Sequence, residues 1–163
     1  MIDHRRLLSH DAGPAVQFIK YAVAGGLATV THIAIFFLIG WFLLPCLTAN
    51  DPLVKLLRLT APAIEGAIRT RHALYCNGIG FMIANFVAYI LNRLFVFRPG
   101  RHHWLVEIGL FYAVSGISLV VGSTLMGVLI GRFGIATTLA FGANLVSALL
   151  INFAARKFLI FRG

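Results

Sequence analysis

The chain carries few charged residues. Asp, Glu, Lys and Arg together make up 12% of its 163 residues, about half the share of a typical soluble domain, and only 5 residues are acidic. A surface so poor in charge argues against a soluble enzyme. Intrinsic disorder is excluded as well, because 60% of the residues are hydrophobic and 12% are aromatic.

Four apolar runs contain no Asp, Glu, Lys or Arg at all. They extend over about residues 21–44, 73–91, 108–130 and 135–155. A helix needs about 20 apolar residues to cross the hydrocarbon core of a bilayer, so each run is long enough for one transmembrane helix. The first run exceeds the apolar segment of a signal peptide, and we expect it in the mature protein. The predicted fold class is an all-α integral membrane protein, with residues 1–163 forming a single domain of four transmembrane helices.

The two halves of the chain repeat each other. Residues 21–25 (YAVAG) match residues 112–116 (YAVSG), and residues 93–98 (RLFVFR) match residues 157–162 (KFLIFR). The offsets of 91 and 64 differ by 27, which is the size of an insertion in the first connection, residues 45–72. Each half is predicted to be a helical hairpin, and two hairpins with even numbers of spans form a parallel repeat.

The insertion mixes leucines with basic residues. Lys55 and Arg58 are three residues apart, so a helix would place both on one face in the outer membrane interface, and Pro62 would interrupt it. The segment is either a re-entrant or surface-lying loop or the lining of a substrate exit.

Lys and Arg set the predicted orientation. Nine of the 14 basic residues flank the side that holds both termini and the second connection, and five lie on the other side. The positive-inside rule therefore predicts that both termini are cytoplasmic in a multi-pass protein of the cytoplasmic membrane. The basic excess, +9 overall, indicates contact with anionic lipid headgroups rather than with nucleic acid.

Basic residues at the cytoplasmic ends of the spans are candidates for binding a phosphate at headgroup depth, because Arg offers a fork of donors and Lys a point charge. These residues are Lys20, Arg93, Arg98, Arg156 and Lys157. Arg93 and Lys157 occupy equivalent positions of the repeat. The alternative is that all five are ordinary positive-inside anchors.

Polar residues within the spans are candidates for a sugar path, because amides and hydroxyls suit sugar hydroxyls. Asn85, Tyr89 and Asn92 share one helix face, and the other spans contribute Asn144, Asn152, Thr29 and His32. Structural hydrogen bonds between helices are the alternative use of such residues. His32 is either a titrating gate or a neutral packing residue.

Several absences narrow the function. No carboxylate lies within a predicted span, which argues against a proton-coupled multidrug exporter and leaves no acidic group to oppose an anionic phosphate along the path. No metal-ligand spacing, P-loop or nucleophile motif occurs, so we expect neither an enzyme nor a cofactor or metal site. Cys46 and Cys76 flank the insertion as free thiols or as a disulfide. Gly127 and Gly131 form a GxxxG motif that permits a homo-oligomer or packing within one chain.

The motifs at the span ends resemble the GtrA family of four-span membrane proteins. They are residues 18–29 (FIKYAVAGGLAT), 85–98 (NFVAYILNRLFVFR) and 152–161 (NFAARKFLIF). The second copy departs from the first, with Arg156 where the first has Asn92, and the insertion is longer than in a typical member.

The resemblance implies translocation of a polyprenyl-phosphate-linked monosaccharide across the cytoplasmic membrane for cell-envelope polysaccharide synthesis. It also implies a GtrB-like glycosyltransferase as partner, which loads the sugar. The missing carboxylate favours facilitated exchange over active pumping. A membrane scaffold that recruits the glycosyltransferase without moving lipid is the alternative.

Overall fold

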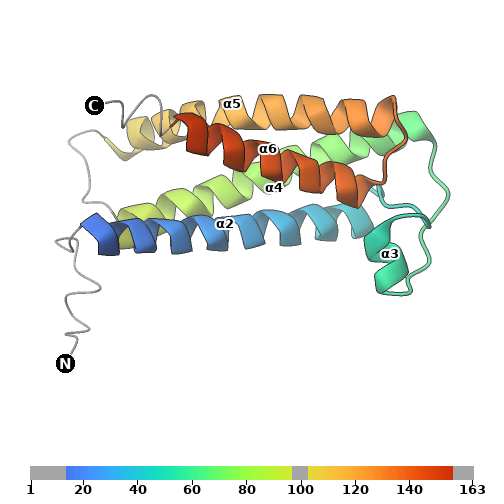
Figure 1. Ribbon diagram of the computed structural model, residues 1–163, viewed down its shortest axis with the longest axis horizontal. Coiled ribbons are helices and arrows are strands. Elements are labelled where there is room, and N and C mark those ends of the chain that lie inside the picture. The colour runs from blue at the N-terminus through green and yellow to red at the C-terminus, as the bar shows by residue number, and fades with distance from the viewer. Residues whose placement is uncertain (1–13, 97–102, 156–163) are drawn as a thin grey trace.

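The computed structural model describes residues 14–96 and 103–155, and these residues form helices and no strand. Four long helices lie alongside one another in an elongated bundle (Figure 1). They are α2 (Pro14–Phe42), α4 (Gly66–Leu91), α5 (Trp104–Gly131) and α6 (Thr137–Ala155). A short helix, α3 (Pro52–Leu56), lies near one end of the bundle, and the π-helical turn η1 (Asn92–Val96) extends α4 at the other.

The helices of each predicted hairpin pack against one another. α2 lies along α4, α5 lies along α6, and α4 and α5 join the two pairs. The bundle thus has an α3 end, where the insertion lies, and an Arg93 end, where α2 begins and η1 follows α4. Under the predicted orientation, the Arg93 end is the cytoplasmic one.

Three helices are long and apolar enough to cross a membrane: residues Val16–Phe42, Gly66–Val96 and Trp104–Gly131. The apolar part of α6, Thr137–Ile151, is shorter, so the fourth span stays a prediction. Large apolar side chains such as Phe18, Leu43, Val120 and Leu149 are more than 60% exposed. Lipid, rather than water, is the solvent that such outward faces require.

Three helices begin earlier than the charge-free runs predict, and the first of them, α2, begins at Pro14 instead of Tyr21. α4 begins at Gly66 instead of Ala73, and α5 begins at Trp104 instead of Ile108. The first two turns of these helices hold charged residues, and a search for uncharged runs stops at charges. These residues are Lys20 in α2, Arg69 and Arg71 in α4, and Glu107 in α5. A helix continues past the hydrocarbon boundary, because charged side chains are well solvated there.

The insertion forms less helix than its sequence predicts. α3 ends at Leu56, and Arg58 adopts a positive φ of 52°, so Lys55 and Arg58 do not share a helix face. The Arg58 N–H donates to the Lys55 carbonyl, and the Leu59 N–H donates to the Val54 carbonyl at 2.9 Å. These two bonds form a Schellman cap, which ends the helix before Pro62 has any effect.

Asp51 ties the insertion to α6. Its carboxylate is fully buried and accepts hydrogen bonds from the Thr137 N–H at 2.9 Å and the Thr138 N–H at 3.1 Å. These donors are at the N-terminus of α6, where backbone N–H groups have no partner within the helix and the dipole favours a negative charge. The Thr137 hydroxyl donates to the Cys46 carbonyl and adds a second tie.

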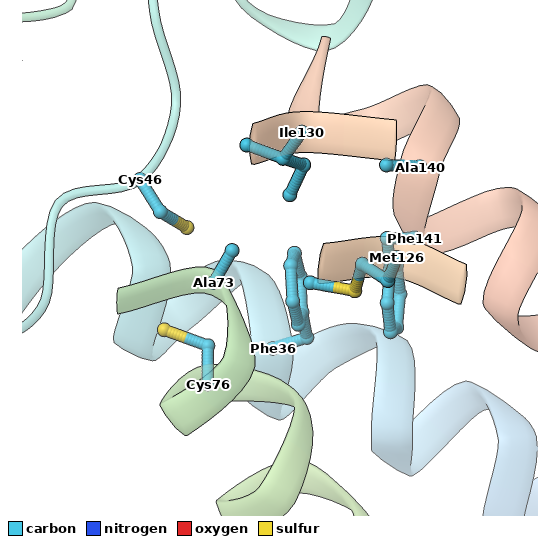
Figure 2. Close-up of a cluster of buried hydrophobic side chains, with 8 residues drawn as sticks. All are labelled: Phe36, Cys46, Ala73, Cys76, Met126, Ile130, Ala140 and Phe141. Carbon is cyan, nitrogen blue, oxygen red and sulfur yellow. The ribbon is translucent and has the colours of Figure 1, made fainter. Parts of the chain in front are cut away.

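The apolar core lies toward the α3 end (Figure 2). Phe36 of α2 stacks on Phe141 of α6 with ring centroids 3.8 Å apart, and Met126 and Ile130 of α5 pack beside them. Cys46 and Cys76 are free, buried thiols at the edge of this core. The hydrogen bond of Cys46 with Cys76, together with burial, raises the pKa of the Cys46 thiol and keeps it protonated.

Candidate functional site

A charged cluster lies at the Arg93 end, where α4 meets the start of α5. The Arg93 Nη1 donates to Glu107 Oε2 at 2.7 Å and to the Tyr89 hydroxyl at 2.7 Å. Tyr89 in turn donates to the same Glu107 oxygen at 3.1 Å. The Arg93 side chain is 36% exposed and that of Glu107 is 18% exposed, so water and headgroups reach the pair.

The π-helical turn carries Arg93 and is tied to α2. The Gln17 side chain donates to the Val96 carbonyl at 3.1 Å, and Lys20, one turn further along α2, is half-buried. A π-helical turn changes the direction in which its side chains leave the helix, and such turns are frequent at functional sites. The start of α2 and the end of α4 therefore bring two predicted phosphate ligands, Lys20 and Arg93, to one end of the bundle.

Two buried amides continue from this end along α4. Asn85 is 8% exposed and Asn92 is 6% exposed. The Asn92 Nδ2 donates to the Ala88 carbonyl at 2.7 Å, but its Oδ1 has no hydrogen-bond partner among the described residues, and neither has the Nδ2 of Asn85. A buried amide atom without a partner is costly, so these two positions can donate to and accept from a polar ligand.

A second group of polar side chains, the central polar cluster, joins all four long helices at mid-depth. It consists of His32 of α2, Asn77 of α4, Ser123 of α5 and Asn144 of α6. The side-chain amide of Asn77 donates to Ser123 at 2.9 Å and accepts from Asn144 at 2.9 Å. The backbone carbonyl of Asn77 lies 3.2 Å from His32 Nε2. Within the described part of the chain, each member of the cluster thus has a hydrogen-bond partner in the cluster.

The structure brings together some of the predicted sugar-path residues and not others. Asn85 and Tyr89 lie buried on α4 and Asn92 lies buried at the start of η1, while His32 and Asn144 meet in the central polar cluster. Thr29 is exposed and donates to the Gly25 carbonyl of its own helix, away from this group. The Asn152 side chain, Arg98, Arg156 and Lys157 lie outside the described residues.

Three site residues were not predicted from the sequence. Glu107 corrects the expectation that no acidic group opposes a phosphate, because it pairs with Arg93 inside the first turn of α5. Asn77 and Ser123 complete the central polar cluster. A signal for Asn77 exists in the sequence, since it lies eight residues before Asn85 and thus on the same helix face.

Comparison with known proteins places this architecture in a family. Residues 20–161 match the family described as "GtrA/DPMS, transmembrane domain". The chain belongs to this family. The resemblance at the span ends is thereby confirmed, and membership associates this GtrA/DPMS protein with polyprenyl-linked sugar processes in a membrane.

One relative is a membrane protein of Bacillus subtilis. The "Uncharacterized membrane protein YwcD" of Bacillus subtilis (strain 168) is 33% identical over 78 residues, which are 46% of this chain and 61% of the relative. The match thus spans less than two thirds of the curated relative. No solved structure matches the chain.

Proposed function

We propose that this protein translocates a polyprenyl-phosphate-linked monosaccharide across the cytoplasmic membrane. The observation that carries the proposal is the sequence of polar groups along α4: a cationic end at Arg93, then the unpartnered amide atoms of Asn92 and Asn85, then the central polar cluster. An anionic headgroup followed by a polar sugar needs this order of groups, while the polyprenyl tail stays in lipid beside the bundle.

The phosphate is assigned to Arg93 and Lys20 at headgroup depth. A guanidinium and an ammonium attract a phosphate strongly, and both side chains lie at the end of the bundle where polar headgroups begin. The predicted ligands Arg98, Arg156 and Lys157 belong to the same proposal by their place in the sequence.

The sugar is assigned to the amides of Asn85 in α4 and Asn92 in η1. Sugar hydroxyl groups both donate and accept. One hydroxyl would accept from the Asn85 Nδ2 and another would donate to the Asn92 Oδ1, the two atoms without a partner among the described residues. For passage to the α3 end, the central polar cluster must exchange its internal bonds for bonds to the sugar. The Phe36–Phe141 stack must also part.

Translocation in proteoliposomes that contain only this protein tests the proposal. We expect the wild type to move a polyprenyl-phosphate monosaccharide between leaflets, and Arg93→Ala or Lys20→Ala to reduce the rate at least tenfold. Arg71→Ala is the matched control, because Arg71 is an exposed arginine on the same helix at the α3 end. A wild-type rate equal to that of empty liposomes, with folded protein, would instead favour the glycosyltransferase scaffold.

A further inference from the structure

Arg93 already bonds a carboxylate, that of Glu107, before any ligand is present. Among the described residues, Glu107 is the one carboxylate at the Arg93 end, since Asp51 and Glu65 lie at the α3 end. Its partner is the arginine to which the phosphate is assigned. The same guanidinium therefore faces two anions, one resident and one arriving with the substrate.

The geometry suits exchange better than a permanent lock. Both hydrogen bonds described for the Arg93 guanidinium come from Nη1, and both reach the same small area formed by Tyr89 and one oxygen of Glu107. An arginine that is held permanently by a carboxylate usually uses two nitrogens in a fork. The partial exposure of both side chains lets a phosphate approach without removing a deeply buried charge pair.

Tyr89 can hold the Glu107 carboxylate after Arg93 has left it. Its hydroxyl donates to Glu107 Oε2 at 3.1 Å, so Glu107 keeps a hydrogen bond when Arg93 turns to another anion. The hydroxyl also accepts from Arg93 through an oxygen lone pair, so its bond to Glu107 does not depend on its bond to Arg93. The cluster thus permits a second arrangement, in which Arg93 contacts another anion while Tyr89 still donates to Glu107.

We infer that Glu107 is a resident counter-anion of the lipid-phosphate site, which the substrate phosphate displaces from Arg93 on binding. The inference rests on the proposed function. Glu107 then sets the affinity threshold of the site, because every phosphate must displace it from Arg93, and a phosphate that carries no hydroxyl groups gains no hydrogen bond from Asn85 and Asn92. A lipid-linked sugar offers both a phosphate and hydroxyls, so its hydrogen bonds to Asn85 and Asn92 offset the cost of displacing Glu107.

Binding of a polyprenyl phosphate to the full chain in phosphatidylcholine nanodiscs tests the inference. We expect Glu107→Gln to tighten binding about three- to fivefold, because a competing charge is lost from a partly exposed pair. Glu107→Asp keeps the charge and is expected to bind like the wild type. In the Arg93→Gln background, Glu107→Gln is expected to have no effect.

The outcomes separate the inference from the function on which it rests. Equal or weaker binding by folded Glu107→Gln, together with weak binding by Arg93→Gln, overturns the counter-anion and leaves the phosphate site intact. Binding by Arg93→Gln that equals the wild type overturns the phosphate site itself.

A spectroscopic measurement decides the question if Glu107→Gln does not fold. Glu65 and Glu107 are the two glutamates of the sequence, so Glu65→Gln with isotopically labelled glutamate leaves Glu107 as the one labelled carboxylate. Its infrared carboxylate bands are expected to shift when polyprenyl phosphate is added and to stay in place when the uncharged polyprenol is added. Bands that do not move with bound phosphate would show that the ion pair persists, and the inference would fail.

Discussion

Gly122 is a residue on which the central polar cluster depends. A Cβ atom added there would lie 2.1 Å from the Asn144 Oδ1 and 3.3 Å from the Ser147 Oγ. Gly80 has the same relation to His32, whose Cδ2 would lie 2.7 Å from an added Cβ. The two glycines therefore allow α4 and α5 to approach the side chains of α2 and α6 closely enough for the hydrogen bonds to form.

We predict that Gly122→Ala destabilises the protein by about 1 to 3 kcal/mol, because the methyl group displaces Asn144 from its bond with Asn77. Gly142→Ala, where an added Cβ meets nothing within 4 Å, is the matched control and is expected to be neutral. The midpoint temperature of each variant is measured by heating the detergent-solubilised protein and following the fraction that remains monodisperse. Equal midpoints for the two variants would contradict the packing described here.

Asn77 is the residue that links the other members of the cluster. We predict a loss of about 1 to 2 kcal/mol for Asn77→Leu, because the substitution leaves the buried Asn144 amide without its acceptor. Thr29→Val is the control, since the Thr29 hydroxyl is exposed and bonds within its own helix. The same thermal assay applies, and a Thr29→Val effect as large as that of Asn77→Leu would refute the difference between the two positions.

Residue types were easier to predict than residue partners. The polarity of His32 and Asn144 inside apolar runs shows in the sequence, but the residues with which they bond come from other helices and depend on how those helices rotate. Glu107 lies one position before a charge-free run, so a search for uncharged runs leaves it out. Its pairing with Arg93 follows from the packing of α4 beside α5.

Among the elements, α6 depends most on a residue outside itself. It is the shortest of the four long helices, and its first turn is capped by Asp51 from the insertion. α4 differs, because its N-cap residue Glu65 is exposed and makes no side-chain hydrogen bond to the helix. The two acidic residues at helix N-termini therefore contribute differently to stability: Asp51 caps α6, whereas Glu65 does not cap α4 through its side chain.

We predict that Asp51→Ala destabilises the protein by about 1 to 3 kcal/mol, because two backbone N–H groups lose their acceptor in a buried place. Glu65→Ala is expected to change stability by less than about 0.5 kcal/mol, as is usual for exposed positions. Hydrogen exchange of the first turn of α6 locates the effect. Faster exchange throughout the bundle, with no excess at Thr137 and Thr138, would argue against a local capping role.

The elements themselves are largely readable from the sequence. Four apolar runs predict four helices near their observed places, since apolar length is a strong signal in a membrane protein. Helix ends are less readable, as at Gly66 and Trp104, because they extend into the interface. α3 ends because Arg58 adopts a left-handed conformation. A glycine at this position would predict such an end from the sequence, whereas an arginine does not.

For the whole molecule, the number of crossings is the property that matters most. Four spans put both termini on one side of the membrane, whereas three spans put them on opposite sides. We predict that reporters fused to the two ends both face the cytoplasm, and that a reporter inserted near Thr60 in the insertion faces outward. Activity of the C-terminal fusion on the outer side would exclude α6 as a span.

The central polar cluster also determines how the four helices are aligned lengthwise. Apolar helices in lipid can slide past one another, since one leucine packs about as well as the next. Four side chains that must meet at a single depth remove this freedom. Asn77 and Arg93 are then separated by a fixed helical path of about 24 Å. One residue inserted between them would rotate the two sites relative to each other by about 100°. The chain length between these sites is therefore constrained even where side-chain identity is not.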